Sequence, residues 1–371
     1  MPNDSAADTT ARLLRRVDHV IADLRRGDLA LLAHDGANLV LEAAETLTSE
    51  GLARLARLTG RQLSLALTRR RAAILGWAEA PSGPGGTVIL PIPEGSEVEF
   101  LRQLADPSAK AETGSVPGLS AVPPAAADAA VELTKLARLL PAVMIGPVND
   151  HAAAELAADG IHAVRVADVL AYRERSAQSL EAAAEAKVPL LDAAETRIIA
   201  FRPSDGGTGH IAIVIGAPDM AQPVLVRLHS ECFTGDLLGS LRCDCGDQLR
   251  GAVAEIARAG SGILLYLAQE GRGIGLVNKL RAYNLQDAGL DTFDANEQLG
   301  FDADERVYVP AAEILRHLGV ARVRLMTNNP DKVAALTRCG IAVVERVPHV
   351  FPANSHNERY LSAKAGHGHH L

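Results

Sequence analysis

The sequence has few aromatic residues, and it lacks any long apolar run. Only 3% of its 371 residues are aromatic within a hydrophobic content of 48%, so the core must be mainly aliphatic. No apolar run approaches the roughly 18–20 residues that a membrane-spanning helix needs. Residues 1–10 are polar and acidic, without the basic and apolar regions of a signal peptide. We therefore expect a cytoplasmic globular protein without a membrane partner.

An excess of positive charge is missing as well. The net charge of −8 argues against the broad basic surface that non-specific nucleic-acid binding requires. A local group of arginines and lysines can still lie inside an acidic protein. The composition therefore excludes nucleic acid as an expected partner and leaves an anionic small molecule open.

The length of the chain predicts two domains. We place the boundary near residue 188, after the Ala/Glu-rich stretch Ser176–Lys187, which is predicted to be a helical connector. The resulting division is a disordered tail over 1–12, an N-terminal domain over 13–187 and a C-terminal domain over 188–371. Both domains alternate predicted helices and strands, which indicates an α/β fold class for each.

Periodicity and turn residues place the individual elements. In the first half we expect helices over 49–58, opened by Ser49, and over 125–140, strands over 62–67 and 143–146, and an irregular loop over 110–124. In the second half we expect strands over 196–201, 210–215, 223–228, 261–267, 323–326 and 341–347. Asn329 and Pro330 form a typical helix start, and Gly340 ends that helix.

Three of the four cysteines lie close together, at Cys232, Cys243 and Cys245. A disulfide framework would spread them out, whereas such clustering is typical of a metal site. Three thiolates suit Zn²⁺, which is tetrahedral and prefers sulfur and nitrogen ligands. With three protein ligands, the fourth corner stays open for a water that the metal acidifies into a hydroxide.

Two alternatives to this open site remain. His229 or His349 could supply a fourth ligand and close it, and three reduced cysteines without chemical use would give the same pattern. Cys339 lies alone at a predicted helix end, where we expect it only to pack.

A triphosphate would need several cations and backbone donors. The candidate cations are Arg227, Arg242, Arg272, Arg306 and Lys332. The loop over 269–275 contains three glycines after a predicted strand, so its N–H groups can approach an anion. Each of these features alone is more typical of an ordinary surface. Their occurrence together with the cysteines favours a nucleotide site.

From about Leu190 to the C-terminus the chain resembles GTP cyclohydrolase II. The segments that carry the resemblance are HSECFTGD (229–236), SLRCDCG (240–246), QEGRGIGL (269–276), NKLRAYNLQD (278–287), LGFDADER (299–306) and TNNP (327–330). The resemblance implies an α/β fold, a homodimer, one Zn²⁺ per subunit on three cysteines plus water, and Mg²⁺ with the triphosphate. It also implies hydrolysis of GTP to 2,5-diamino-6-ribosylamino-4(3H)-pyrimidinone 5′-phosphate, formate and pyrophosphate, the first committed step of riboflavin synthesis.

The resemblance also assigns roles by position. Cys232, Cys243 and Cys245 match the zinc ligands. Arg306 matches the nucleophile proposed for the α-phosphate, Asp304 its proton acceptor, and Tyr283 the tyrosine that assists ring opening. The positions that match GTP contacts are Arg227, Leu228, His229, Ser230, Glu231, Gln248, Glu270, Gly271, Arg272, Thr292, Thr327 and Lys332.

Two points of this assignment stay open. An arginine is almost always protonated, so Arg306 could instead act only as an electrostatic clamp on the phosphoryl group. Ala268 stands where many family members carry an arginine, which removes one cation from the phosphate region.

The first half resembles, more faintly, 3,4-dihydroxy-2-butanone-4-phosphate synthase. The traces are IADLRRGD (21–28), AAE (43–45), LT (67–68) and AAVEL (129–133). That enzyme needs an acidic Mg²⁺ loop and a Gly-His-Thr-Glu motif, but here the loop is reduced to residues 33–38 and the motif is replaced by Ala125–Asp128. Because alanine neither moves protons nor binds metals, we expect a catalytically inactive lobe that serves dimerisation or stability.

Three other functions compete with a monofunctional GTP cyclohydrolase II. The same scaffold could act on another nucleotide, such as a uracil nucleotide. The chain could be a non-catalytic regulatory or assembly protein. It could also be bifunctional, with an active first half.

Overall fold

The computed structural model describes residues 6–79, 81, 85–107 and 122–349. The chain divides into two compact units. The N-terminal unit comprises residues 1–173 and 277–305, and the C-terminal unit comprises residues 174–276 and 306–371. Segment 277–305 is therefore grouped with the first half of the chain, although it lies inside the domain predicted over 188–371. Among the described residues, no helix has the length and apolarity needed to cross a membrane.

The N-terminal unit is built on a six-stranded mixed sheet. Its order is β4 (Thr87–Pro91), β3 (Ser64–Thr68), β5 (Ala142–Val148), β2 (Ala37–Ala43), β1 (Ala30–His34) and β6 (Ala163–Arg165). Neighbouring strands run antiparallel except for β1 and β6, which are parallel. The helices are α1 (Ala6–Arg26), α2 (Ser49–Leu58), α3 (Arg69–Ile74), α4 (Val98–Ala105), α5 (Pro124–Leu136), α6 (Asp150–Ala158), α7 (Val166–Leu170), α10 (Leu276–Asp287) and α11 (Thr292–Gln298).

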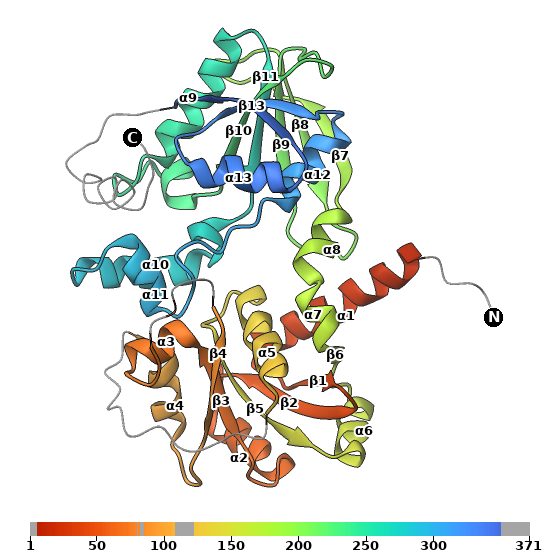
Figure 1. Ribbon diagram of the computed structural model, residues 1–371, viewed down its shortest axis with the longest axis vertical. Coiled ribbons are helices and arrows are strands. Elements are labelled where there is room, and N and C mark those ends of the chain that lie inside the picture. The colour runs from red at the N-terminus through yellow and green to blue at the C-terminus, as the bar shows by residue number, and fades with distance from the viewer. Residues whose placement is uncertain (1–5, 80, 82–84, 108–121, 350–371) are drawn as a thin grey trace. The chain divides into compact units, whose positions relative to one another are not determined.

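The main core of this unit lies between the sheet and helices α1, α5 and α7 (Figure 1). On α1, Leu14, Val17, Ile21 and Leu24 recur at helical spacing and are buried. They pack with inward-facing residues of the strands and with the alanine-rich face of α5. An aliphatic core therefore forms without large aromatic side chains.

The C-terminal unit has a seven-stranded sheet. Its order is β13 (Ala342–Val347), β12 (Arg322–Met326), β10 (Val224–Ser230), β11 (Gly262–Leu267), β9 (His210–Ile215), β8 (Thr196–Arg202) and β7 (Glu181–Lys187). The helices are α8 (Tyr172–Gln178), which begins just before this unit, α9 (Cys245–Arg258), α12 (Val309–His317) and α13 (Pro330–Arg338).

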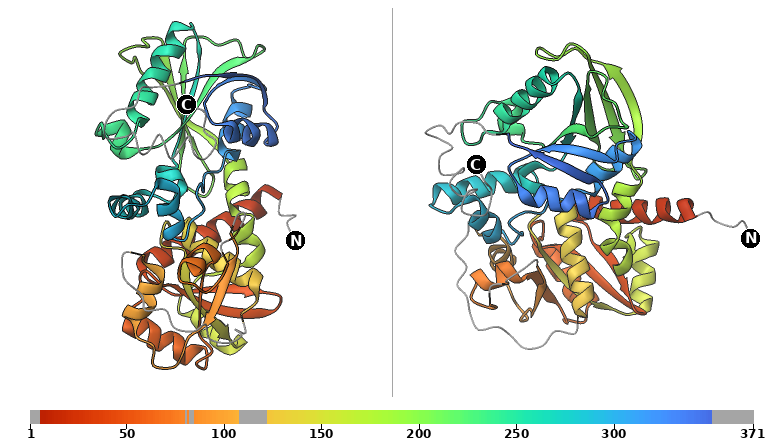
Figure 2. Two further views of the ribbon diagram at one scale, coloured as in Figure 1. Left: turned by 60° about the vertical axis from the view of Figure 1, so that its left-hand side comes forward. Right: turned by 45° about the horizontal axis from the view of Figure 1, so that its top comes forward.

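Helices cover both faces of this sheet, as Figures 1 and 2 show. Helix α9 packs on one face, while α12 and α13 pack on the other. Strands β13, β12, β10 and β11 are parallel to one another, and β9, β8 and β7 continue the sheet from β11 with antiparallel pairing. Both units are thus layered α/β structures, which confirms the predicted fold class.

Most predicted elements of the C-terminal half are confirmed within one or two residues. The unit β12–α13–β13 forms as expected, with the Asn329 side chain accepting a hydrogen bond from the Asp331 N–H at 2.7 Å. In the N-terminal half, α5 ends at Leu136 rather than at residue 140. Arg138 has φ of +60°, a left-handed backbone that stops the helix.

Two predictions were wrong. Ser176–Lys187 is not a helical connector, because α8 ends at Gln178 and β7 pairs with β8. The ladder hydrogen bonds of an edge strand override the helix propensity of alanine and glutamate there. The tail over 1–12 is not disordered from residue 6 on, since the packed apolar stripe of α1 supports a helix that begins at Ala6.

Smaller differences concern caps and loops. Helix α2 is capped by Thr48 rather than opened by Ser49, and the Thr48 hydroxyl accepts from the Gly51 N–H at 3.0 Å. Residues 110–121 of the predicted loop and the histidine-rich segment 366–370 lie outside the described residues.

Candidate functional site

The candidate site lies where three neighbouring parallel strands end. Strands β11, β10 and β12 run in the same direction, so their carboxyl ends meet at one edge of the C-terminal sheet. Cys232 follows β10, the Glu270 loop follows β11, and Thr327 follows β12. Ligands of open α/β sheets bind at this edge, because the loops that follow the strands can converge there.

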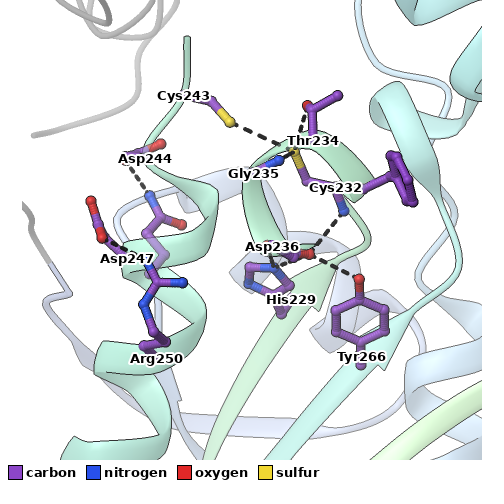
Figure 3. Close-up of polar contacts among 12 residues, drawn as sticks. His229, Cys232, Thr234, Gly235, Asp236, Cys243, Asp244, Asp247, Arg250 and Tyr266 are labelled. Carbon is purple, nitrogen blue, oxygen red and sulfur yellow. Dashed lines mark hydrogen bonds and ion pairs between the residues drawn. The ribbon is translucent and has the colours of Figure 1, made fainter. Parts of the chain in front are cut away.

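The three clustered cysteines come together at this edge. Their sulfur atoms all lie within 4.8 Å of one another, and the Sγ atoms of Cys232 and Cys243 are 3.6 Å apart (Figure 3). All three are free thiols. Tetrahedral ligation at the usual Zn–S distance of about 2.3 Å separates two sulfurs by about 3.8 Å, so the observed spacing fits a zinc site.

Gly235 leaves room for this cluster. A Cβ atom at this position would lie 2.8 Å from the Sγ of Cys243 and 3.0 Å from that of Cys232. The Gly235 N–H also donates to the Cys232 sulfur at 3.3 Å. An N–H directed at a sulfur favours its thiolate form, which is the form that ligates metals. Glycine at position 235 therefore lets the backbone approach the sulfur atoms more closely than a residue with a Cβ atom would allow.

The crowded thiols resist ionisation on their own. The hydrogen bond with Cys232, together with burial, raises the pKa of Cys243 to about 11. Hydrogen bonds with Cys232 and Cys243, together with burial, raise the pKa of Cys245 well above its ordinary value. Three thiolates at this distance repel one another, and a divalent cation removes that repulsion. The three cysteines could thus hold a metal ion, and their sulfur donors suit zinc.

Asp236 lies at the centre of the hydrogen bonds around the first cysteine, although the sequence predicted no role for it. Its Oδ2 accepts hydrogen bonds from the Cys232 N–H and the Tyr266 hydroxyl, both at 2.9 Å, and its carboxylate lies 3.0 Å from the Nε2 of His229 (Figure 3). The carboxylate therefore joins the first cysteine to the buried ring of His229 and the half-buried ring of Tyr266. Asp236 is the last residue of the segment HSECFTGD (229–236), which resembles the family, so its position could have marked it as a candidate. The sequence alone, however, does not reveal which side chains it contacts.

Neither histidine considered as a fourth ligand joins the cysteines in the described part of the chain. His229 is bound to Asp236 and stacks on Tyr266 with ring centroids 5.5 Å apart. Burial lowers the pKa of His229, which favours a neutral ring. The Nε2 of His349 lies 3.1 Å from the Gln248 carbonyl oxygen, and its Nδ1 lies 3.4 Å from a Glu255 oxygen. The structure therefore does not support either histidine as a fourth ligand of a metal ion at the cysteines.

Two buried cations flank the end of β10. The Arg227 guanidinium donates to the Met326 carbonyl at 2.9 Å and to the Gln248 side chain at 2.5 Å, while its Nε has no hydrogen-bond partner in the structure. Burial lowers the pKa of Arg227 to about 10, so it still carries its charge at neutral pH. The Lys332 ammonium donates to the Leu228 carbonyl at 3.0 Å. Their buried positive charges favour an anionic ligand.

The loop after β11 has an unusual backbone. Gly271, Arg272, Gly273 and Gly275 all have φ between +62° and +99°. Glycine adopts this left-handed conformation freely, whereas Arg272 does so at a cost of about 1–2 kcal/mol. Glu270 is buried, and its carboxylate accepts from the Phe233 N–H at 2.6 Å and the Gly271 N–H at 3.0 Å. Strain of this kind concentrates at functional sites.

Other predicted contacts lie on the same strands. Leu228 and Ser230 belong to β10, and the Glu231 N–H that follows them donates to the Leu267 carbonyl at 2.8 Å. The buried Ser230 hydroxyl has no hydrogen-bond partner in the structure. The buried Thr327 hydroxyl accepts from the Asn329 N–H at 3.0 Å.

The remaining predicted residues divide between the two units. Tyr283, Thr292 and Asp304 belong to the N-terminal unit, whereas Arg306 belongs to the C-terminal unit. The ring of Tyr283 lies 5.7 Å from the Lys279 ammonium, and the guanidinium of Arg306 lies 6.0 Å from the Tyr308 ring.

Comparisons with known proteins identify relatives of this chain. The family model for GTP cyclohydrolase II matches residues 181–348. A GTP cyclohydrolase-2 from Azospirillum brasilense is 53% identical over 100% of this chain and 96% of its own length. A GTP cyclohydrolase-2 from Azotobacter vinelandii is 59% identical over 44% of this chain and 79% of its own length.

Among solved structures, a two-domain 3,4-dihydroxy-2-butanone 4-phosphate synthase from A. baumannii covers 91% of this chain and 100% of its own. Its 18% identity and TM-score of 0.37 are too low to support an argument about function. The full-length match to the Azospirillum protein and the family model over the cysteine region lead to one conclusion: the chain belongs to the GTP cyclohydrolase II family.

Proposed function

We propose that the protein is a zinc-dependent GTP cyclohydrolase II. It would hydrolyse GTP to 2,5-diamino-6-ribosylamino-4(3H)-pyrimidinone 5′-phosphate, formate and pyrophosphate, and so serve riboflavin biosynthesis. The observation that carries the proposal is the convergence of three sulfur atoms within 4.8 Å at the carboxyl ends of parallel strands. Relatives named GTP cyclohydrolase-2 and riboflavin biosynthesis protein RibBA support the choice of reaction.

Cys232, Cys243 and Cys245 would hold the zinc ion. A zinc ion held there would supply Lewis-acid chemistry that lowers the pKa of water near the poorly electrophilic C8 of guanine. The chain's own residues keep this centre in place. Asp236 fixes the backbone N–H of Cys232, and Gly235 leaves the space that the sulfurs occupy.

The triphosphate would lie against fixed positive charge. Arg227 and Lys332 are buried cations beside β10, and Arg272 in the glycine-rich turn after β11 would add a third positive charge. Mg²⁺ bound to the triphosphate would neutralise part of the remaining negative charge of the phosphate groups. The substrate would thereby be oriented with its base toward the cysteines.

Three side chains would then act on the reacting groups. Tyr283 would donate a hydrogen bond or shuttle a proton during ring opening. Arg306 would stabilise charge at the α-phosphate, and Asp304 would accept a proton there. Because the guanidinium is almost always protonated, a clamp role for Arg306 needs no further assumption, whereas a nucleophilic role requires concerted proton transfer to Asp304.

Product analysis tests the proposed reaction. Purified protein with zinc and Mg²⁺ is incubated with GTP and, separately, with UTP, and formate and pyrophosphate are measured. We expect both products from GTP and neither from UTP. Formate from UTP but not from GTP would replace the proposal with a cyclohydrolase for uracil nucleotides.

We further propose that the N-terminal unit has no synthase activity, in a homodimeric cytoplasmic protein. The positions expected for a proton-transfer motif are Ala125–Asp128, and Ala126 and Ala127 are fully buried in α5. Their methyl groups pack in the core instead of facing a substrate. Incubation of the full chain with ribulose 5-phosphate and Mg²⁺ should give no 3,4-dihydroxy-2-butanone 4-phosphate, and product formation would show that the protein is bifunctional.

A further inference from the structure

The segment 277–305 has an unexpected place in the fold. It lies within the stretch that matches the cyclohydrolase family model, residues 181–348, yet it packs as part of the N-terminal unit. The chain leaves the C-terminal unit after Leu276 and returns to it at Arg306. Between these points lie Tyr283, Thr292 and Asp304, which carry expected roles in GTP hydrolysis.

Arg70 of α3 holds the end of this segment through two carboxylates. Its Nε donates to Asp302 at 2.6 Å, and its Nη1 donates to Glu297 at 2.6 Å. The Arg70 side chain is only 14% exposed, and that of Asp302 is 21% exposed. A planar guanidinium that bridges two acids restricts the position of both. Figure 1 shows α3 and α11 side by side in this unit.

Lys135 of α5 binds the same stretch at Glu305, the residue that follows Asp304 in the sequence. Its ammonium lies 2.5 Å from a Glu305 oxygen, and the two side chains are 11% and 10% exposed. The same Glu305 oxygen accepts from the Asp302 N–H at 2.9 Å. Asp304 therefore sits between two residues, Asp302 and Glu305, that are each tied to a cation of the N-terminal unit.

Further contacts support the segment along its length. Arg281 of α10 pairs with Glu45 at 2.8 Å, and the Asn278 amide donates to the Arg138 carbonyl at 3.1 Å. The Thr68 hydroxyl donates to the Gly300 carbonyl at 2.7 Å. Glu45 belongs to one of the traces of the synthase-like sequence in the first half, so part of that sequence now supports the segment.

We propose that Arg70 and Lys135 are positioning residues that set the place of Asp304 for the cyclohydrolase reaction. The inference rests on the proposed function, because it gives the N-terminal unit a part in that reaction. Half-exposed or buried ion pairs of this kind cost desolvation energy and add little stability by themselves. Their effect is to fix geometry, and a displacement of about 1 Å in a reacting group lowers the rate by roughly a hundredfold.

The test uses the full chain with Arg70→Met and Lys135→Met, singly and combined. We expect the double variant to lower kcat for formate release from GTP by about ten- to a hundredfold, with KM within about threefold of the original. Zinc content should not change. Amide hydrogen exchange in residues 293–305 should become about tenfold faster, since the anchored stretch opens locally.

Arg165→Met is the matched control. Arg165 forms an ion pair with Asp168 at 2.8 Å in the same unit, and its Nε and Nη2 both donate to that carboxylate rather than to residues 277–305. It should leave kcat and exchange in 293–305 unchanged. A folded double variant with kcat within twofold of the original and unchanged exchange would overturn the inference.

Two conservative variants keep the test decisive if the double variant does not fold. Arg70→Lys keeps the charge but reaches one carboxylate, so kcat should still fall, whereas Lys135→Arg keeps its pair and should retain kcat. Full activity in Arg70→Lys would contradict the inference. If the original protein releases no formate from GTP, the proposed function fails, and unchanged exchange in Arg70→Lys would then refute the anchoring separately.

Discussion

The two units of this protein share an architecture but differ in strand direction. In the C-terminal unit, β11, β10 and β12 are parallel neighbours, and their ends bring cysteines, cations and a glycine-rich loop to one edge. In the described part of the N-terminal unit, β1 and β6 are the one parallel pair. Parallel neighbours direct successive loops to the same edge, and this is why the residues of the candidate site converge at one edge of the C-terminal sheet.

The alanines of α5 show what occupies the interior of the N-terminal unit. Ala126, Ala127, Ala129 and Ala130 are all fully buried against the sheet. Small side chains let the helix approach the strands closely, which serves packing and leaves no group for chemistry. These alanines of the N-terminal unit therefore serve packing, whereas the C-terminal unit holds the candidate metal centre.

Removal of a cysteine should have the largest effect. Cys243→Ser should lose bound zinc and lower formate release by about a thousandfold or more, because under the proposal zinc would supply the nucleophile. Metal analysis and product assays check this. Cys339→Ser is the control, since Cys339 lies outside the cluster and should leave zinc and turnover unchanged. Retained zinc and turnover in Cys243→Ser would favour a non-catalytic protein.

Loss of the Asp236 carboxylate should have the next largest effect. Asp236→Asn keeps the size of the side chain but weakens its hydrogen bonds to Cys232, His229 and Tyr266. We expect zinc affinity to fall about ten- to a hundredfold in a chelator competition. Asp247→Asn is the matched control, because Asp247 is 63% exposed and forms a surface ion pair with Arg250. Equal affinity in both variants would mean that Asp236 does not support the centre.

Two arginines with a left-handed backbone offer a direct comparison of the units. Arg272 has φ of +62° and Arg61 has φ of +68°. Replacing either with glycine removes strain, with a net gain of up to about 1 kcal/mol after the entropy cost of glycine. Arg61→Gly should leave kcat/KM unchanged, whereas Arg272→Gly should lower it about tenfold or more by removing a phosphate contact. Equal kcat/KM in the two variants would remove Arg272 from the site.

The smallest effect concerns a buried carboxylate of the N-terminal unit. Burial raises the pKa of Glu42 from 4.5 to about 7. The folded state therefore binds the proton more tightly than the unfolded state, and its stability falls as pH rises from about 4.5 to 7. Glu42→Gln should raise Tm by a few degrees at pH 8 and little at pH 4.

Glu50→Gln, at an exposed position of α2, is the control for this pH effect and should change Tm equally little at both values. A gain for Glu42→Gln that is equal at pH 4 and pH 8 would show that the Glu42 carboxyl does not titrate between them.

Much of the site could be predicted from the sequence because its signals are local. The Cys-x-Cys pair, the glycine-rich loop and the Asn-Pro helix start each depend on neighbouring residues. The same local reasoning failed for Ser176–Lys187, whose strand β7 depends on pairing with β8. It also gave no role to Asp236, because its three partners come from two strands and a loop.

The sequence alone thus determined the α/β class, the position of most strands and the three cysteines of the candidate metal centre. Only the tertiary structure decided which segments belong together, including the grouping of 277–305 with the N-terminal unit through Arg70 and Lys135. The reason is that periodicity and turn chemistry act over a few residues. Ion pairs and strand pairing join residues that are far apart in the chain, and their geometry exists only after the chain has folded.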